Sequence, residues 1–135
     1  MTWLFKGEPV TEIDDEWIAF VYIITNLITG RQYIGLKTTK STKTRIVKGK
    51  KKRTKVDSDW RDYWSSSEEL KKDIETLGQE NFKREILYFC PNKGTANFLE
   101  AREQFERKVL ENRDKWYNGI INCRVHWSHI KHYKY

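Results

Sequence analysis

The sequence has only two cysteines, Cys90 and Cys123, and no apolar run close to the roughly 20 residues that a membrane-spanning helix requires. Two cysteines are too few for a disulfide framework, so a reducing cytoplasm is the expected location. Residues 1–15 also lack the apolar core of a secretory signal. These absences exclude a small disulfide-stabilised secreted domain and predict a protein with no membrane partner.

Aromatic residues and positive charge are abundant instead. The 135 residues fit one domain, and contents of 38% hydrophobic and 14% aromatic residues are sufficient for a compact core. The net charge of +7 favours a polyanionic partner. Between Lys37 and Lys55, ten of nineteen residues are Lys or Arg and none is acidic. We interpret this run as a loop or mobile extension that contacts phosphates; the alternative is a merely solubilising loop.

Runs of β-branched and aromatic residues predict the strands. Residues 16–26 and 31–36 are two such runs, and the turn between them contains Gly30, so an antiparallel hairpin is expected. Residues 81–90 predict a third strand, which Pro91 ends. Around these elements we expect an irregular arm at 1–15, a folded domain at 16–125 whose residues 116–125 form a short strand or extended segment, and a tail at 126–135.

Two stretches have the periodicity and the end signals of helices. In the first, residues 65–78, Ser66 and Glu69 can form a capping box and Gly78 suits the C-terminal end. The second covers residues 95–112. The predicted apolar faces are Leu70, Ile74 and Leu77 in the first helix and Phe98, Ala101, Phe105 and Val109 in the second. The order of two strands, helix, strand and helix is that of a small α/β or α+β domain.

Two tyrosines, Tyr22 and Tyr33, lie on the predicted hairpin. Two tyrosines on a hairpin are usually just a cross-strand aromatic pair. Their context, however, resembles the GIY-YIG nuclease superfamily. The second half of that motif is intact as Tyr33-Ile34-Gly35, whereas the first reads Phe20-Val21-Tyr22 and keeps only its tyrosine. The linker NLITGRQ between them resembles the linker of the superfamily.

Further segments resemble the superfamily in the same order along the chain. WRDYWSSSEELKKDIETLGQENFKREIL is similar to the middle of small, free-standing phage-encoded members, and NFLEAREQF to the helix that supplies their catalytic glutamate. WYNGIIN is similar to the closing Tyr-Asn element. The resemblance spans roughly residues 17–125. It implies a small three-stranded antiparallel sheet flanked by helices, and a metal-dependent endonuclease that hydrolyses phosphodiester bonds in double-stranded DNA, of a phage homing or host-DNA-degrading type.

The resemblance also implies a role for individual residues. The catalytic set is Tyr22, Tyr33, Lys37, Arg45, Glu100 and Asn118, with Lys43 as an alternative to Arg45. Glu100, or else Glu103, would hold Mg²⁺ (or Mn²⁺), because that ion prefers carboxylate oxygens and water. The phenols would position or deprotonate water, and a base role requires nearby cations that lower their pKa from about 10. We expect the lysine-rich run to supply those cations and Gly35 to allow close backbone approach.

The remaining basic residues are assigned to the DNA backbone: Lys43, Lys48, Lys50, Lys51, Lys52, Arg53 and Lys55. Two alternatives to an active nuclease remain open. One is a catalytically inactive nucleic-acid-binding domain on the same fold, since the first half of the motif has lost its Gly-Ile pair. The other is a basic protein–protein adaptor, which would not bind DNA in a salt-dependent manner.

Two segments have no settled role in the sequence. Cys123, His126, His129 and His132 recur every three residues, but ligands at that spacing rotate around a helix and do not converge on one ion, so a loose DNA-contacting tail is favoured over a zinc site. The aromatic residues of SDWRDYW, residues 58–64, are expected to dock on the core, with stacking on bases as the alternative.

Overall fold

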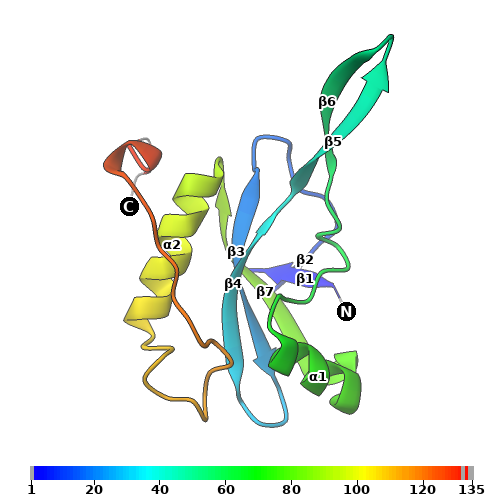
Figure 1. Ribbon diagram of the computed structural model, residues 1–135. Coiled ribbons are helices and arrows are strands. Elements are labelled where there is room, and N and C mark those ends of the chain that lie inside the picture. The colour runs from blue at the N-terminus through cyan, green and yellow to red at the C-terminus, as the bar shows by residue number, and fades with distance from the viewer. Residues whose placement is uncertain (1, 132, 134–135) are drawn as a thin grey trace.

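A computed structural model of the protein describes residues 2–131 and 133. Its centre is a five-stranded mixed sheet with the order β2-β1-β7-β3-β4. The strands are β1 (Trp3–Phe5), β2 (Glu8–Val10), β3 (Ala19–Asn26), β4 (Gln32–Thr38) and β7 (Phe82–Cys90). Helix α1 (Glu68–Leu77) and helix α2 (Lys93–Glu106) lie on opposite sides of this sheet (Figure 1). The expected mixed α and β fold is confirmed, whereas the sheet is larger than expected.

Alternation along β3 explains why the two helices take opposite faces. Successive side chains of a strand point to opposite faces of the sheet. Phe20, Tyr22 and Ile24 are buried in a cluster with Leu70 and Ile74 of α1. Ala19, Val21 and Ile23 are buried in a second cluster with Ala96 and Leu99 of α2. The central strand is therefore buried on both faces, and Tyr22 points toward the α1 side.

The predicted hairpin and third strand are confirmed. Strands β3 and β4 pair antiparallel, with Tyr22 opposite Gly35, and β7 pairs antiparallel with the other edge of β3. Gly30 in the connecting turn has a φ of +80°, a conformation that glycine adopts without a steric penalty. Tyr22 lies on β3 and Tyr33 on β4, so the two tyrosines lie on paired strands, as the predicted hairpin requires.

The N-terminal residues were expected to form an irregular arm, and that expectation is wrong. Strands β1 and β2 form a hairpin, and β1 adds to the sheet parallel to β7. Trp3 is only 1% exposed, and its indole Nε1 donates a hydrogen bond to Trp60 O at 2.7 Å. Strands of three residues are too short to produce a visible alternation, so the sequence pattern does not reveal them.

The lysine-rich run is not a loop. It forms the antiparallel strands β5 (Lys40–Val47) and β6 (Lys50–Asp57), which project from the body as a two-stranded ribbon (Figure 1). The turn at the tip is Lys48-Gly49, and both residues have positive φ, 52° and 74°. A two-residue turn of this kind matches the twist of a hairpin. The sequence does not indicate this hairpin, because neither strand has an apolar face that would produce an alternating pattern.

Helix α1 lies close to its predicted bounds, whereas α2 ends at Glu106, six residues before the predicted end at Asn112, so Val109 is buried outside the helix. Helix α1 is capped by Ser67 rather than Ser66, because the Ser67 hydroxyl accepts a hydrogen bond from Leu70 N at 3.2 Å. Leu70 and Ile74 are buried as predicted, and Gly78 ends the helix. In α2 the predicted stripe is wrong at Phe105, which is 65% exposed.

The buried side of α2 includes two polar residues, Glu103 and Gln104, together with Leu99. Their side chains form hydrogen bonds with Tyr88 of β7 and Ile34 of β4. The helix face that packs on the sheet is therefore partly polar, unlike the apolar stripe that the sequence predicted. The aromatic residues of segment 58–64 dock on the core as expected: Trp60 is buried, and Tyr63 and Trp64 pack against the same cluster.

After α2 the chain runs beside β4 without forming a regular strand. Among residues 2–131 and 133, its backbone forms one isolated β-bridge with the sheet, between Trp116 and Gln32, which matches the extended-segment alternative. The short helix η2 (Trp127–His129) rests on the start of α2, where Thr95 Oγ1 donates to His129 O at 3.0 Å. The described part of the tail is thus docked rather than loose, while His132 lies outside the described residues.

Two further findings concern the described residues, 2–131 and 133. No helix among them is both long and apolar enough to cross a membrane. No group of three or more His, Cys, Asp or Glu side chains among them is arranged to hold a metal ion. The Cys/His spacing in the tail therefore creates no metal cluster within this range.

Candidate functional site

A small polar pocket forms where β4, α2 and the segment after Trp116 meet. It encloses about 210 Å³, and its walls include Tyr33, Ser66, Glu100, Gln104 and Asn118. Three of these residues, Tyr33, Glu100 and Asn118, are the ones that the sequence analysis singled out. Residues separated by up to 85 positions in the chain are thus brought to one place, because strand β4 lies between α2 and the returning segment.

The two tyrosines are neighbours across the hairpin, but they differ in access to solvent. Their ring centroids are 6.2 Å apart. Tyr22 is 1% exposed, and its ring also meets that of Tyr63 at 6.2 Å. Tyr33 is half-buried, lines the pocket, and has its hydroxyl 3.2 Å from Ser66 Oγ. Tyr33 therefore presents its phenol to the pocket, whereas Tyr22 lies behind it.

Gly35 makes room for Tyr22. An added Cβ at Gly35 would collide with the Tyr22 hydroxyl and lie 2.5 Å from its Cζ atom. The same Cβ would approach Tyr33 Cε1 to 2.9 Å. The sequence analysis expected Gly35 to allow another group close to the backbone. Within the protein, that group is the Tyr22 side chain. The glycine of the Tyr-Ile-Gly motif and the tyrosine of the first half-motif are thus sterically coupled.

Glu100 is the carboxylate of the pocket. It is half-buried on α2, and burial raises its pKa to about 7. Across the described part of the chain, no hydrogen bond or ion pair to its carboxylate is found. Its charge raises the pKa of both Tyr22 and Tyr33, in each case less than burial does. Glu100 therefore faces the tyrosines without a counter-ion among the described groups.

Glu103, the alternative carboxylate, has structural partners instead. It accepts a hydrogen bond from the Tyr88 hydroxyl at 2.5 Å and one from Arg107 Nε at 2.9 Å. Burial alone would raise the pKa of Glu103, but these two bonds outweigh burial and lower it. Because Glu103 is bound to β7 and to its own helix, the structure places Glu100 rather than Glu103 in the pocket.

Asn118 is held by the backbone of β4. Its Oδ1 accepts a hydrogen bond from Ile34 N at 3.0 Å, and its Nδ2 donates to Ile34 O at 2.8 Å. Gln104 Nε2 donates to the same carbonyl at 3.1 Å. These bonds join the segment after Trp116 and helix α2 to the centre of the Tyr33-Ile34-Gly35 motif. Asn118 thus fixes the strand that carries Tyr33.

Of the three candidate catalytic cations, Lys37 lies beside Tyr63, whereas Lys43 and Arg45 lie on the ribbon. Lys37 Nζ lies 4.3 Å from the centre of the Tyr63 ring and forms an ion pair with Asp59 at 2.6 Å. Arg45 and Lys43 belong to β5 and are carried away from the pocket on the projecting ribbon. The structure therefore does not bring Arg45 to the site.

The expectation that the lysine-rich run lowers the phenol pKa values is also wrong. Burial, followed by Tyr33, Tyr63 and Glu100, holds the pKa of Tyr22 well above its usual value. Burial raises the pKa of Tyr33 as well, although the hydrogen bond with Ser66 opposes that shift. Arg45 and the cations of β6 are exposed on the ribbon and do not offset the burial. Both phenols are therefore protonated at neutral pH in the free protein.

Sequence reasoning missed three residues of the site. Ser66 was interpreted as a helix cap, but it bonds to Tyr33. Gln104 lies four residues after Glu100, so the i, i+4 spacing places both on one helix face and was a usable signal. Tyr63 had no such signal, because its contact with Tyr22 depends on how the segment after β6 folds back.

Comparisons with known proteins agree with this geometry. The chain matches the family model described as "Putative endonuclease segE, GIY-YIG domain" over residues 3–121. Comparisons with curated proteins and with solved structures find no significant match. The matched range contains both tyrosines, Glu100, Asn118 and the whole sheet. The chain therefore belongs to this GIY-YIG endonuclease family.

Proposed function

We propose that the protein is a metal-dependent endonuclease that hydrolyses phosphodiester bonds in double-stranded DNA. The observation that carries the proposal is the Glu100 carboxylate, half-buried beside Tyr33 and without a partner among the described residues. Phosphodiester hydrolysis needs a positioned water and stabilisation of developing negative charge. A polar pocket that contains this carboxylate can orient a water molecule and bind a cation that stabilises the negative charge.

The residues present fit a divalent cation. Burial raises the pKa of the Glu100 carboxyl to about 7, so the charged form is destabilised by desolvation. A bound cation would stabilise that charged form. Mg²⁺ (or Mn²⁺) is commonly held by one or two carboxylates, several waters and substrate phosphates rather than by an all-protein cage. Glu100 would hold the ion, with the hydroxyls of Tyr33 and Ser66 near it. When bound, the ion supplies positive charge to the phosphate and the leaving oxygen.

The protonated phenols act as donors and positioning groups rather than as bases. Tyr33 faces the pocket, so its hydroxyl donates a hydrogen bond to a phosphate oxygen or orients the attacking water. Tyr22 is buried behind it and fixes the ring of Tyr33 and the backbone at Gly35. Lys37, held beside Tyr63 by Asp59, contributes positive charge at the edge of the site. Asn118 keeps β4 in place.

Cleavage of supercoiled plasmid tests the proposal. The wild-type protein should nick or linearise the plasmid in Mg²⁺ and leave it intact in EDTA. Glu100→Ala should abolish cleavage and retain DNA binding, whereas Glu106→Ala, an exposed glutamate at the end of the same helix, should cleave like wild type. Cleavage by Glu100→Ala at the wild-type rate would refute the assigned role of this carboxylate.

A catalytically inactive DNA-binding domain is the second candidate. It is favoured by the first half-motif, which keeps only Tyr22, and by the burial of that tyrosine. An intact plasmid in Mg²⁺, together with salt-dependent DNA binding, would support it. Sequenced product ends would separate the two biological roles that the resemblance suggests, since a homing-type enzyme cuts at one preferred site and a host-DNA-degrading enzyme cuts at many. Either role places the protein in the cytoplasm.

A further inference from the structure

We propose that the β5–β6 ribbon enters the major groove of B-form duplex DNA and contacts phosphates on both walls of that groove. The inference rests on the proposed function for its partner, DNA, but it concerns a different part of the molecule from the pocket. It extends the assignment of these basic residues from general phosphate contact to one mode of docking. Three observations carry it: where the charge lies, how it is distributed over the two faces, and how the ribbon is anchored.

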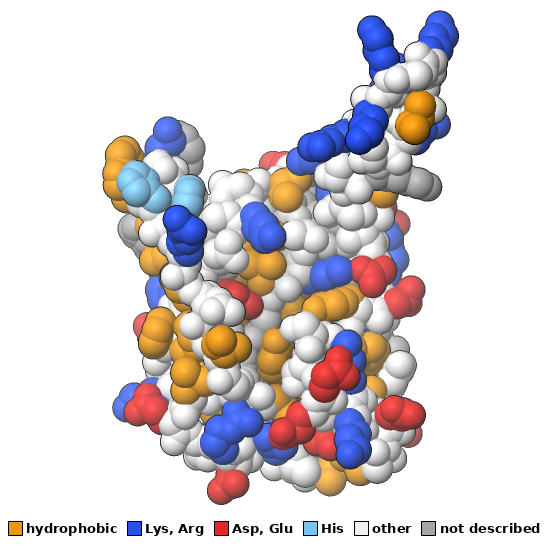
Figure 2. All heavy atoms as spheres, in the orientation of Figure 1, with side chains coloured by type: hydrophobic (Ala, Val, Ile, Leu, Met, Phe, Trp, Pro, Cys, Tyr) orange, Lys and Arg blue, Asp and Glu red, His pale blue; other side chains and the backbone are white. Residues whose placement is uncertain are grey.

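The positive charge of the molecule is concentrated on the ribbon. The eighteen residues from Lys40 to Asp57 contain nine Lys or Arg and one acid, a net charge of +8. The whole chain has a net charge of +7, so the rest of the chain carries a net charge of −1. Figure 2 shows the Lys and Arg side chains spread along the projecting ribbon, whereas both signs of charge are mixed over the body below it. A polyanion is therefore attracted to the ribbon first.

The charges lie on both faces of the ribbon. Side chains directly opposite each other in an antiparallel pair share a face, and successive residues alternate between faces. Arg45 is opposite Lys52 and Val47 is opposite Lys50, so the first face, the Arg45 face, carries Arg45, Lys50 and Lys52. By the same register the second face, the Arg53 face, carries Lys51, Arg53 and Lys55. All six of these side chains are exposed.

Two charged faces indicate two phosphate walls. A ribbon laid along a single DNA strand would need cations on one face only, and one that packed on another protein would present an apolar face. The major groove of B-form DNA, about 12 Å wide, admits a two-stranded ribbon without deformation, whereas the minor groove, about 6 Å wide, would first have to be widened at a cost in DNA deformation energy. Eight residues per strand extend about 26 Å at roughly 3.3 Å each, long enough to follow the groove.

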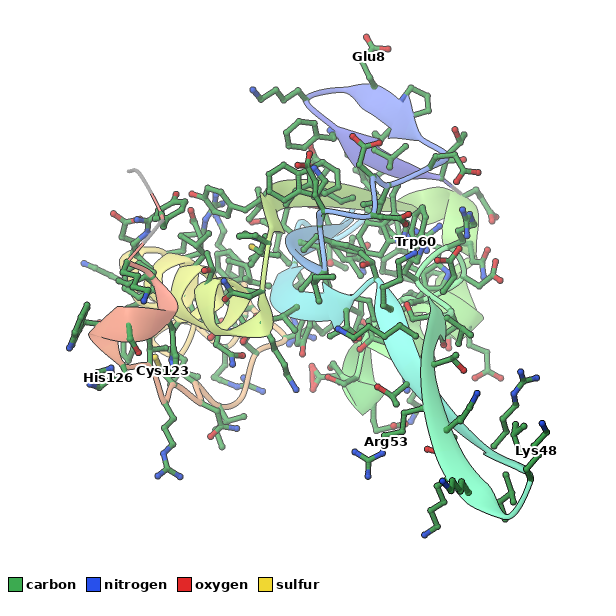
Figure 3. All side chains as sticks on the ribbon, turned by 90° about the horizontal axis from the view of Figure 1, so that it is seen from above. Glu8, Lys48, Arg53, Trp60, Cys123 and His126 are labelled. Carbon is green, nitrogen blue, oxygen red and sulfur yellow. The ribbon has the colours of Figure 1, made fainter. Side chains whose placement is uncertain are left out.

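The base of the ribbon is fixed to the body at the end of β4, the strand that also carries Tyr33 of the pocket. Lys40 pairs with Asp57 at 2.5 Å and with Asp15 at 2.9 Å, and Ser58 N donates to Thr39 O at 2.9 Å. Just below this base, Lys37 and Asp59 form the ion pair beside Tyr63. Seen from above, Lys48 marks the tip far from the body, and Arg53 points out sideways from the ribbon (Figure 3). A groove occupied by the ribbon would thus continue toward the pocket.

Matched charge removals test the two-wall geometry. The Arg45 face is neutralised by Arg45→Ser, Lys50→Ser and Lys52→Ser, and the Arg53 face by Lys51→Ser, Arg53→Ser and Lys55→Ser. The control replaces three exposed lysines of the body, Lys72, Lys83 and Lys93, by Ser. Affinity for a duplex is measured across a salt series in EDTA, so that no cleavage occurs and the outcome is independent of nuclease activity. Far-UV circular dichroism checks that each variant is folded.

Each lost phosphate contact should flatten the slope of log affinity against log salt by about 0.9, so each face variant should flatten it by up to about 2.7. The control should keep the wild-type slope. If only one face variant changes the slope, the ribbon lies along a single strand and the inference is overturned. If the control variant flattens the slope as much as the face variants do, the attraction is spread over the whole surface, and the inference is likewise overturned.

Modified duplexes test which groove is used. Replacing thymine by uracil with a bulky group at C5 fills the major groove and should weaken wild-type binding to the level of the face variants. A double-stranded RNA of the same sequence has a deep, narrow major groove that the ribbon cannot enter, so only general attraction remains and the face variants should lose less affinity for RNA than for DNA. Undiminished binding to the filled duplex, or an equal loss by the face variants on RNA, would overturn the inference. A protein that failed to cleave plasmid yet passed these tests would refute only the proposed function.

Discussion

At the scale of the residue, the two tyrosines have different tasks. Tyr33 presents its hydroxyl to the pocket, so Tyr33→Phe should lower kcat by about 10²-fold while leaving the melting temperature near that of wild type. The ring, and therefore its packing against Tyr22, is retained. Single-turnover cleavage of a short duplex measures the effect. Wild-type kcat in Tyr33→Phe would mean that the phenol only packs.

Glu100 should make stability depend on pH in a way that a cation reverses. The folded protein keeps the Glu100 proton up to a pKa of about 7, whereas the unfolded chain loses it near 4.5. Between those values the folded state binds more protons, so the free energy of unfolding should fall as the pH rises. The fall should be smaller in Glu100→Gln than in wild type or in Glu106→Gln.

The same carboxylate predicts a response to Mg²⁺ that does not require catalysis. At pH 8, saturating Mg²⁺ should raise the melting temperature of wild type by a few degrees, because a ligand that binds only the folded state stabilises it. Glu100→Gln should not respond, and Glu106→Gln should respond like wild type. Equal shifts in all three proteins would place the ion somewhere other than Glu100.

Gly35 is required by the side chain that lies against it. Gly35→Ala should destabilise the protein by about 1–3 kcal/mol, because its Cβ would force Tyr22 or β4 to move. Gly119→Ala is the matched control, since the nearest atom to a Cβ there is 3.9 Å away. Urea unfolding measures both. A Gly35→Ala protein as stable as wild type would show that Tyr22 can shift freely.

At the scale of the element, the N-terminal hairpin is part of the core. Trp3 is buried against Phe20 and Tyr22, with ring centroids 5.1 and 5.2 Å away. Trp3→Ala should therefore cost about 3–5 kcal/mol in the free energy of unfolding. Glu8→Ala, on the exposed neighbouring strand, should have little effect. If both variants unfold at the wild-type urea midpoint, β1 does not contribute to the core.

The sequence predicts those helices and strands whose buried side chains recur at regular intervals along the chain. The apolar run of β3 and the spacing of Leu70 and Ile74 in α1 were sufficient to place both elements. Strands β1 and β2, three residues each, offer no period to detect. In α2 the buried face includes Glu103 and Gln104, and their burial depends on partners on β7 and β4 that no local pattern reveals.

The candidate site divides in the same way. Tyr33, Gly35 and Glu100 were predictable because short motifs and one helix carry them. Arg45 lies outside the pocket in the free protein, and the sequence could not predict this position, because a charged ribbon without an apolar face does not indicate whether the run folds back or projects. The direction of the phenol pKa shifts could not be predicted either, since it follows from the burial of Tyr22 between Trp3, Tyr33 and Tyr63.

At the scale of the whole molecule, the two proposals assign DNA binding and chemistry to separate regions. The body, with a net charge of −1, holds the pocket, and the ribbon carries a net charge of +8. Because the body carries no net positive charge, the proposed DNA binding assigns most of the electrostatic attraction to the ribbon. Removing its charge should therefore change how much DNA is bound and leave the chemistry of the bound complex intact.

Neutralising both faces together tests this separation. In the variant with Arg45, Lys50, Lys51, Lys52, Arg53 and Lys55 replaced by Ser, the KM for duplex DNA at 0.2 M salt should rise by at least about 10²-fold, since six phosphate contacts are lost. The kcat at low salt and saturating DNA should stay close to that of wild type, because Tyr33, Lys37 and Glu100 are unchanged. Glu100→Ala should show the opposite split, with binding retained and kcat abolished. A comparable loss of kcat in the sixfold variant would mean that the ribbon takes part in the chemistry, and that Arg45 reaches the scissile phosphate once DNA is bound.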